Sequence, residues 1–260
     1  MIRFITFFIL LSFFGCQSQP GNPEKVVDAS CLSNSDTSIS EIFLKDIKPP
    51  AGYKRFPADP VSFAAWLRSV PLKKDKTVYL YNGKIKSNQS AQYAVIDISV
   101  GNKDLQQCAD AVMRLRAEYL YMQKKYDAIA FMDYSGKWYK WTKGSNRLAF
   151  DNYLQTVFGW CGSASLEKQL KPVNNFNKIK AGDVLIQGGF PGHAITVMDI
   201  AVNEEGKKVF MLSQGYQPAQ DMHVLINPMK PALSPWYEFG ETEQIITPEW
   251  HFTKKNLKTW

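Results

Sequence analysis

The chain has 260 residues, of which 45% are hydrophobic and 21% are charged, which is the composition of an ordinary globular protein. This length favours one domain, or one domain with a small appended part, and it provides ample material for a buried core. The net charge is +7, but the basic residues are dispersed rather than blocked, so we expect no nucleic-acid partner. A basic surface also suits anionic cell wall or lipid head groups, and it equally suits a role in solubility alone.

The start of the chain has the pattern of a targeting signal. Met1-Ile2-Arg3 is a short basic segment, and residues 4–14 form an apolar run too short to span a membrane as a mature helix. The following Gly15-Cys16 resembles the cleavage site of bacterial lipoproteins, although a plain secretory signal with a chance cysteine is the alternative. The pattern predicts a signal peptide over residues 1–15 and Cys16 as the lipid anchor. It places the protein in the cell envelope, anchored through its lipid to a membrane on the outer-membrane or periplasmic side.

The rest of the chain divides into a tether and a domain. Residues 16–39 are polar and contain few apolar side chains, which predicts a flexible tether. Residues 40–260 form the predicted single α+β domain. The cysteines at 31, 108 and 161 are too far apart for a zinc motif, and nothing in the sequence selects a disulfide. We therefore expect no metal and no cofactor.

The first elements of the domain are short. Asp59-Pro60 is typical of a helix start, with Asp as the N-cap and Pro at the first helical position. A strand follows over residues 77–81. Asn82-Gly83 suits a two-residue hairpin turn, because both residues tolerate positive φ. A second strand is expected over residues 93–100.

The longest predicted helix covers residues 104–125. Its buried stripe is formed by Leu105, Cys108, Val112, Leu115 and Tyr119, which follow helical spacing. Cys108 would then lie about one turn inside the helix. It is either a small buried apolar side chain or a nucleophile aided by the field of the helix N-terminus. A hairpin over 128–142 and a helix over 148–158 are expected next.

A second cysteine follows that helix. Cys161 lies between Gly159 and Gly162, and Ser163 or Ser165 can cap a further helical turn. This places Cys161 at or just before a helix N-terminus, where the helix dipole lowers the pKa of a thiol. The alternative is a small side chain packed between two helices.

A glycine-rich turn connects the next two strands. Val184-Leu185-Ile186 is an apolar run, residues 188–192 must turn, and His193 opens a second run over 194–201. Gln187 leaves the first strand opposite His193, and Gln214 ends the following strand near the same edge. Either amide could orient the imidazole, as a general base requires. Asp199 cannot, since six residues along a strand place it roughly 20 Å away.

The order Gly-Asp, apolar strand, glycine-rich turn, Gly-His and apolar strand over residues 180–199 resembles NlpC-type and CHAP-type cell-wall peptidases and amidases. The resemblance implies an antiparallel sheet with helices packed on one side and an NlpC/papain-like core over residues 100–226. It also implies that His193 is the general base for a cysteine at a helix N-terminus. The NlpC-type Asp-Cys-Ser-Gly signature is absent, because Trp160 stands where the Asp would be.

Over nearly its whole length, the chain also resembles a family of Bacteroidetes lipoproteins built on a domain of unknown function. The residues that carry this second resemblance are Gln107–Ala111, Arg114–Tyr119, Gly188–His193, Tyr216–Gln220 and Leu233–Tyr237. This family brings no established activity to the chain.

The leading hypothesis is an envelope cysteine peptidase or amidase that acts on cell-wall peptides. The thiolate of Cys161, or of Cys108 as the second choice, would attack the carbonyl, and His193 would move the proton. Gln187 or Gln214 would orient the imidazole.

The competing hypothesis is a non-catalytic lipoprotein. The same hairpin, with Phe190, and the loop that holds Tyr216 and Gln220 would then bind a glycan, a peptide or a protein partner. A purely structural lipoprotein is the third alternative.

Overall fold

The computed structural model describes residues 42–239 and 244–260. The predicted signal peptide, the anchor Cys16, the tether over 16–39 and Cys31 lie outside these residues. Within the described ranges, none of the helices is both long enough and apolar enough to cross a membrane.

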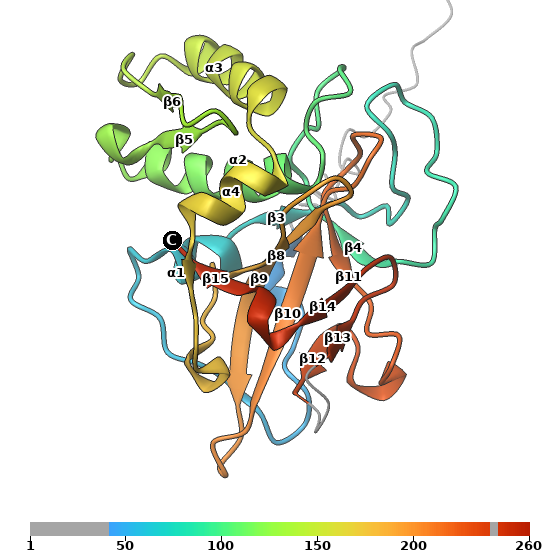
Figure 1. The fold of residues 1–260 in the computed structure, drawn as a ribbon. Helices are drawn as coiled ribbons and strands as arrows, with labels where there is room; N and C mark the ends of the chain where they lie inside the picture. The colour runs from blue at the N-terminus through green and yellow to red at the C-terminus, as the bar shows by residue number, and fades with distance from the viewer. Residues whose placement is uncertain (1–41, 240–243) are drawn as a thin grey trace, which may run out of the picture. The chain divides into compact units, whose positions relative to one another are not determined.

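The domain is built on a nine-stranded antiparallel sheet (Figure 1). Across the sheet, the strands are β4 (Gln92–Val95), β11 (His223–Leu225), β10 (Lys208–Gln214), β9 (His193–Val202), β8 (Val184–Gln187), β15 (Leu257–Thr259) and β7 (Lys171–Pro172). Two further strands pair with the centre: β12 (Trp236–Glu238) with β10, and β2 (Lys54–Arg55) with β9. The two longest strands, β9 and β10, therefore hold most of the sheet together.

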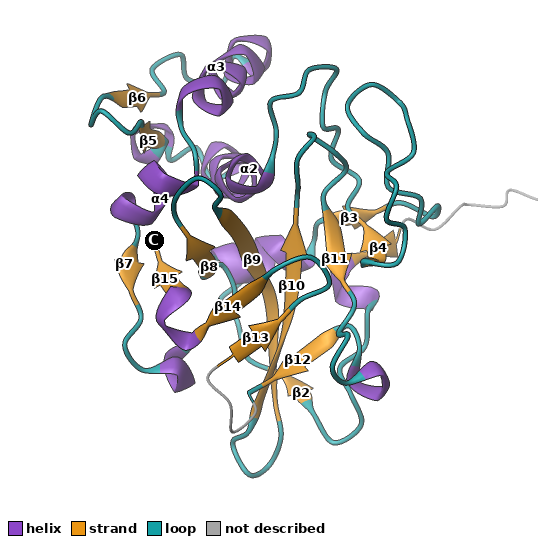
Figure 2. Ribbon diagram, turned by 45° about the vertical axis from the view of Figure 1, so that its right-hand side comes forward, coloured by secondary structure: helices purple, strands orange, loops and turns teal. Residues whose placement is uncertain are grey.

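The described residues contain four helices; three of them lie against one face of this sheet, and the one over Arg147–Trp160 packs on the long helix instead (Figure 2). The four helices are α1 (Phe63–Arg68), α2 (Cys108–Met122), α3 (Arg147–Trp160) and α4 (Ser163–Gln169). Both α1 and α2 pack on β9, and α4 packs on β8. The architecture is therefore α+β, as the sequence predicts.

The sheet is buried on both faces. Val184 and Ile186 point into the core beneath the helices, whereas Leu185 between them points into a second core on the opposite face. The hairpin of β13 (Gln244–Ile246) and β14 (His251–Thr253) contributes to this second core. Burial on both faces explains why this strand is a continuous apolar run rather than an alternating one.

The smaller elements complete the domain. Two short antiparallel pairs lie outside the large sheet: β1 (Ile42–Phe43) pairs with β3 (Pro71–Leu72), and β5 (Ala130–Met132) forms a hairpin with β6 (Trp138–Lys140). Single 3₁₀ turns cover Leu44–Asp46, Tyr126–Ala128, Phe176–Lys178, Pro231–Leu233 and Lys254–Asn256. The predicted hairpin over 128–142 and the predicted helix over 148–158 are thus confirmed.

Three early boundaries were wrong. The first helix begins at Phe63 with Ser62 as its N-cap, because the Asp59 carboxylate instead accepts the N–H of Val61 at 2.9 Å and closes a turn. Residues 77–81 form only isolated bridges, and the turn that follows has positive φ at Gly83 but not at Asn82. The strand expected over 93–100 ends at Val95.

The start of the long helix was also wrong, and this correction matters for the site. The helix begins at Cys108, because the carboxylate of Asp110 accepts the N–H of Gln107 at 3.0 Å and caps the helix there. Asp104 lies outside the helix and accepts the N–H of Ala219 at 2.7 Å. Cys108 is therefore the first helical residue rather than one a turn inside.

Candidate functional site

A cavity of about 610 Å³ lies where the first turn of α2 meets the loop between β8 and β9 and the loop after β10. Both described cysteines and one histidine line it, together with several aromatic side chains, of which Phe190 is exposed. The lining residues used below are Cys108, Cys161, His193, Phe190, Tyr216 and Trp250. The two loops meet here because β9 and β10 are neighbours and both loops lie at the same end of them.

Cys108 occupies the N-terminal position of α2 and is partly buried. Burial raises the pKa of its thiol, and the nearby Asp110 carboxylate raises it further. The backbone N–H groups of Ala194, Ala109 and Cys108 itself act in the opposite direction, because they stabilise a thiolate. Since Ala194 directly follows His193, the sulfur of Cys108 lies beside the start of β9. In this state the thiol is protonated at neutral pH.

Cys161 has a different setting. It is the C-cap of α3, with its N–H bonded to the carbonyl of Val157 at 2.8 Å, and α4 begins only at Ser163. Its side chain is buried, and burial raises the pKa of the thiol to about 12, with contributions from Asp110 and Asp133. Cys161 thus lies just before the N-terminus of α4, as predicted, but it also closes α3, and the C-terminal end of a helix disfavours negative charge.

His193 is 1% exposed, and its Nε2 atom lies 3.0 Å from Oε1 of Gln214. The amide nitrogen of Gln214 lies 2.6 Å from the carboxylate of Glu249, which can only accept, so the orientation of the amide is fixed. Nε2 of His193 must therefore carry the proton that Oε1 accepts. Nδ1 is left as the basic nitrogen of this ring.

The second histidine completes the same network. Nε2 of His223 lies 3.3 Å from the amide nitrogen of Gln214, and its Nδ1 lies 2.9 Å from the carbonyl of Asp221. His223 therefore donates from Nδ1 and accepts at Nε2. Gln214 thus holds both imidazoles and Glu249 in one chain of hydrogen bonds that has a single consistent direction.

Glu249 is itself held by two side chains from a distant part of the sequence. Nζ of Lys86 lies 2.6 Å from one carboxylate oxygen, and Nδ2 of Asn88 lies 3.0 Å from the other. Burial raises the pKa of Glu249, but these partners outweigh it and the pKa lies below its ordinary value. A partly buried carboxylate therefore stays charged behind Gln214.

Aromatic rings enclose the imidazole of His193. The ring centres of Tyr216, Trp250 and Phe252 lie 5.0, 5.3 and 5.9 Å from it. Burial lowers the pKa of His193 to about 4, and burial lowers that of His223 to about 4 as well. At neutral pH the Cys108 thiol and the His193 imidazole are therefore both neutral, and Nδ1 is the free nitrogen of the ring.

The structure brings some predicted site residues together and separates others. Gln214 bonds His193, whereas Gln187 pairs with it only through the backbone and has an exposed side chain. Phe190 is 92% exposed on the cavity lining, and Tyr216 packs edge-on against the imidazole. Gln220 is 1% exposed and lies outside the cavity lining.

Sequence reasoning missed several residues of this network. They are Lys86, Asn88, His223, Glu249 and Trp250. Lys86 and Glu249 meet across 163 positions of sequence, so no local spacing indicates the pair. His223 had a usable signal, because it is one of only three histidines and opens an apolar strand.

The described residues also bear on metal binding. Over 42–239 and 244–260, no three His, Cys, Asp or Glu side chains gather as the ligands of a metal ion would.

The fold and this site define an α+β domain with a cysteine, a histidine and a glutamine at one end of an antiparallel sheet. The chain matches domain of unknown function 4846 (DUF4846) in two overlapping segments, residues 43–147 and 137–259. It therefore belongs to the DUF4846 family. No match is found among curated proteins or among solved structures.

Proposed function

We propose that the protein is a cysteine hydrolase of amide bonds, in which Cys108 is the nucleophile, His193 the general base and Gln214 the residue that orients the base. The observation that carries this proposal is the hydrogen bond between Nε2 of His193 and Oε1 of Gln214 at 3.0 Å. It leaves Nδ1 to take a proton, and the first residue of α2 lines the same cavity as a thiol.

Three features favour Cys108 over Cys161, the first choice from the sequence. Cys108 begins a 15-residue helix, whose free N–H groups stabilise negative charge. Its sulfur lies near the N–H of Ala194, next to the proposed base. Cys161 ends a helix instead, and its thiol pKa of about 12 is far from neutral.

The proposed reaction starts from the neutral pair. As a substrate carbonyl enters, Nδ1 of His193 takes the proton of the Cys108 thiol, and the sulfur bonds to the carbonyl carbon. The backbone N–H groups at the start of α2 stabilise the resulting oxyanion. The tetrahedral intermediate then collapses: the C–N bond breaks, the imidazolium gives its proton to the leaving amine, and a thioester remains.

Water completes the cycle. Nδ1 of His193 takes a proton from water as its oxygen attacks the thioester, and the carboxylic acid leaves as Cys108 recovers its proton. The charge of Glu249 raises the pKa of His193, and so stabilises the imidazolium that forms twice in this sequence. The amide of Gln214 lies between the two groups and bonds the ring on one side and the carboxylate on the other.

The chain order supports a papain-like core over residues 100–226. A cysteine at a helix start is followed by a histidine at the start of one strand and by an amide at the end of its neighbour. The cell-wall peptide as substrate rests on the resemblance of residues 180–199 to cell-wall enzymes. The envelope location and the lipid at Cys16 rest on the pattern of residues 1–16.

The test compares two cysteine variants and one histidine variant in soluble protein that begins after Cys16. Wild type, Cys108→Ala, Cys161→Ala and His193→Ala are treated with iodoacetamide, and labelling is measured at each cysteine by mass spectrometry. The same proteins are incubated with peptidoglycan peptides, and their products are identified. We expect hydrolysis in wild type and Cys161→Ala and none in Cys108→Ala or His193→Ala. Hydrolysis that persists without Cys108 would reject the proposal.

One observation favours the non-catalytic alternative. The pKa of Cys108 is raised and His193 is buried, so the pair is not charged in this state, and Phe190 stands 92% exposed at the cavity. A binding protein for peptides or glycans would use the same cavity. In that case wild type and Cys108→Ala would bind peptidoglycan fragments with the same affinity, and neither would release a product.

A further inference from the structure

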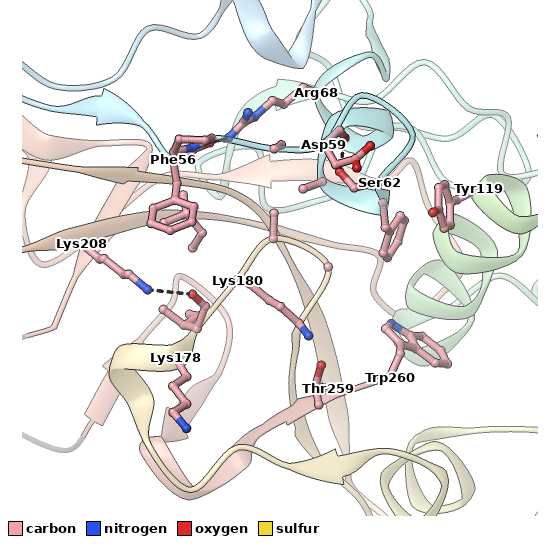
Figure 3. Close-up of a pocket in the computed structure, with 18 of the residues that line it drawn as sticks. Phe56, Asp59, Ser62, Arg68, Tyr119, Lys178, Lys180, Lys208, Thr259 and Trp260 are labelled. Carbon is pink, nitrogen blue, oxygen red and sulfur yellow. Dashed lines mark hydrogen bonds between the residues drawn. The ribbon is translucent and has the colours of Figure 1, made fainter. Parts of the chain in front are cut away.

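A second cavity, of about 700 Å³, lies between α1, α2, the segment before β8 and the end of β15 (Figure 3). It shares no lining residue with the cavity of Cys108 and His193. Figure 3 shows Lys180, Thr259 and Trp260 together on one side and Phe56 with Lys208 on another. Its volume is that of a typical small-molecule site, about 300–1,000 Å³.

Most of the charged side chains that line this cavity are positive. Five Lys or Arg side chains line it, against one side-chain carboxylate, that of Asp59; the five are Arg68, Arg116, Lys178, Lys180 and Lys208. The Asp59 carboxylate accepts the N–H of Val61 and keeps its charge, so the side chains that line the cavity still carry an excess of positive charge. A concave surface with this excess of positive charge concentrates anions.

Some of these cations already have protein partners. Arg68 is paired with Asp199 at 2.7 Å and donates to the carbonyl of Phe56 at 2.7 Å. Lys208 donates to the carbonyl of Asn177 at 2.6 Å. These two side chains therefore shape the wall, and the remaining three are left for a ligand.

Arg116 is the central group. Its guanidinium lies 5.3, 5.5 and 5.5 Å from the ring centres of Phe63, Tyr119 and Trp260. Burial lowers its pKa, and among the described residues no carboxylate lies within ion-pair distance of it. A partly buried arginine held by three rings without a counter-ion keeps its planar set of donors for an incoming anion.

Apolar side chains make up much of the rest of the wall. The aromatic rings that hold Arg116 continue into Phe56, Ile179 and Ile200. A simple inorganic ion would leave these side chains without a partner, whereas an anion attached to a ring or short hydrocarbon body would cover them.

We propose that this cavity binds an organic anion, a phosphate or carboxylate carried on an aromatic or aliphatic body, with Arg116 and Lys180 on the charged group. The inference is independent of the proposed hydrolase function, because the two cavities are separate. The anion has two sources: a soluble small molecule or the head group of an anionic lipid.

The test is isothermal titration of the soluble domain with phenyl phosphate, inorganic phosphate and phenol. We expect phenyl phosphate to bind more tightly than either part alone. Loss of one charge-assisted bond in Arg116→Gln or in Lys180→Gln should weaken binding about tenfold or more. Lys140→Gln, which removes an exposed charge on β6, and Cys108→Ala should leave it unchanged.

Two variants are needed because Arg116 also packs against aromatic rings, so its replacement can disturb folding. Lys180→Gln removes charge without that packing, and thermal unfolding checks both proteins. The proposal is overturned if phenyl phosphate does not bind wild type, or if it binds both variants with the same affinity as wild type.

Co-sedimentation with phosphatidylcholine vesicles, with and without phosphatidylglycerol, distinguishes a lipid head group from a soluble anion. Arg116-dependent binding only to the anionic vesicles indicates a lipid, and its absence indicates a soluble ligand.

Discussion

Gln214 joins His193 to Glu249. Its amide oxygen lies 3.0 Å from Nε2 of the histidine, and its amide nitrogen lies 2.6 Å from a carboxylate oxygen of Glu249. A carboxylate only accepts, so the amide nitrogen of Gln214 must point to Glu249 and its amide oxygen to His193. Nε2 of His193 must therefore carry the proton, and the carboxylate beyond the amide determines the tautomer of the buried imidazole. The chemistry of His193 is therefore set by residues that do not line the cavity.

The amide of Gln214 should be essential for stability, whereas that of Gln187 should not. Gln214→Leu leaves the buried Nε2 atoms of His193 and His223 without their partner, and each such group costs about 1–3 kcal/mol. We expect a loss of at least about 2 kcal/mol in the free energy of unfolding. The exposed Gln187→Leu should change it by less than about 0.5 kcal/mol. Urea titration measures both, and equal losses would contradict the network.

The two buried histidines should make the protein sensitive to mild acid. The pKa of His193 and that of His223 are about 4 in the folded protein, against an ordinary value of 6.5. The unfolded chain therefore binds protons first as the pH falls. The stability from the neutral rings is complete above about 6.5, declines between about 6.5 and 4, and is lost below this window.

The slope of that decline identifies the groups responsible. Each histidine contributes a slope of about 1.4 kcal/mol per pH unit within the window. Urea midpoints measured across it should fall more gently in His223→Gln than in wild type. The exposed His251→Gln should keep the wild-type slope. A wild-type slope in His223→Gln would contradict the buried neutral state.

The ion pair of Lys86 and Glu249 should affect the pKa of His193. The charge of Lys86 lowers the pKa of His193, and that of Glu249 raises it. Lys86→Met leaves the carboxylate charge unopposed, so the pKa of His193 should rise from about 4, as followed by NMR titration of its ring protons. Removing one partner of a buried pair should also cost about 3 kcal/mol.

A double variant tests the same pair from the other side. Adding Glu249→Gln to Lys86→Met removes the unpaired charge and should return the pKa of His193 toward its wild-type value. Lys84→Met, an exposed lysine two residues away, should leave the pKa unchanged. A histidine that titrates identically in all four proteins would show that Glu249 does not act through Gln214.

Local pattern predicted much of this site. The apolar run, the glycine-rich turn and the histidine placed β8, β9 and the pairing of Gln187 with His193 correctly. The sequence left Gln187 and Gln214 as equal candidates, because a strand pattern gives the pairing of backbones and not the bonds of side chains. The choice depends on which amide is buried beside Glu249, a contact made across 35 positions.

The sequence pattern did not predict the correct start of the helix that carries Cys108. Apolar periodicity extends to Leu105, so the pattern predicted a start near Asp104, but the bond from Gln107 to Asp110 begins the helix four residues later. Apolar spacing does not distinguish a side chain packed before a helix from one within its first turn. For Cys161 the sequence predicted the position between two helices correctly, but it left open whether the side chain is buried, and that burial raises the pKa of the thiol to about 12.

The turn before His193 should tolerate no side chain at Gly192. A Cβ atom there would lie 2.3 Å from Oγ of Ser163, 2.7 Å from the carbonyl of Gly189 and 2.8 Å from that of Gln187. Two of these are backbone atoms, so the loop itself must shift and carry His193 with it. Gly192→Ala should lower the free energy of unfolding by about 1–3 kcal/mol.

Gly192→Ala also tests whether the proposed hydrolysis depends on the position of His193. Displacing His193 should reduce hydrolysis of peptidoglycan peptides at least about tenfold, since general-base catalysis needs the base within hydrogen-bond reach. Gly159→Ala is the control: it also lies on the cavity lining, and its Cβ would meet no atom within 4 Å. It should keep stability, because alanine favours a helix interior. Full stability and activity in Gly192→Ala would mean that this turn does not position the histidine.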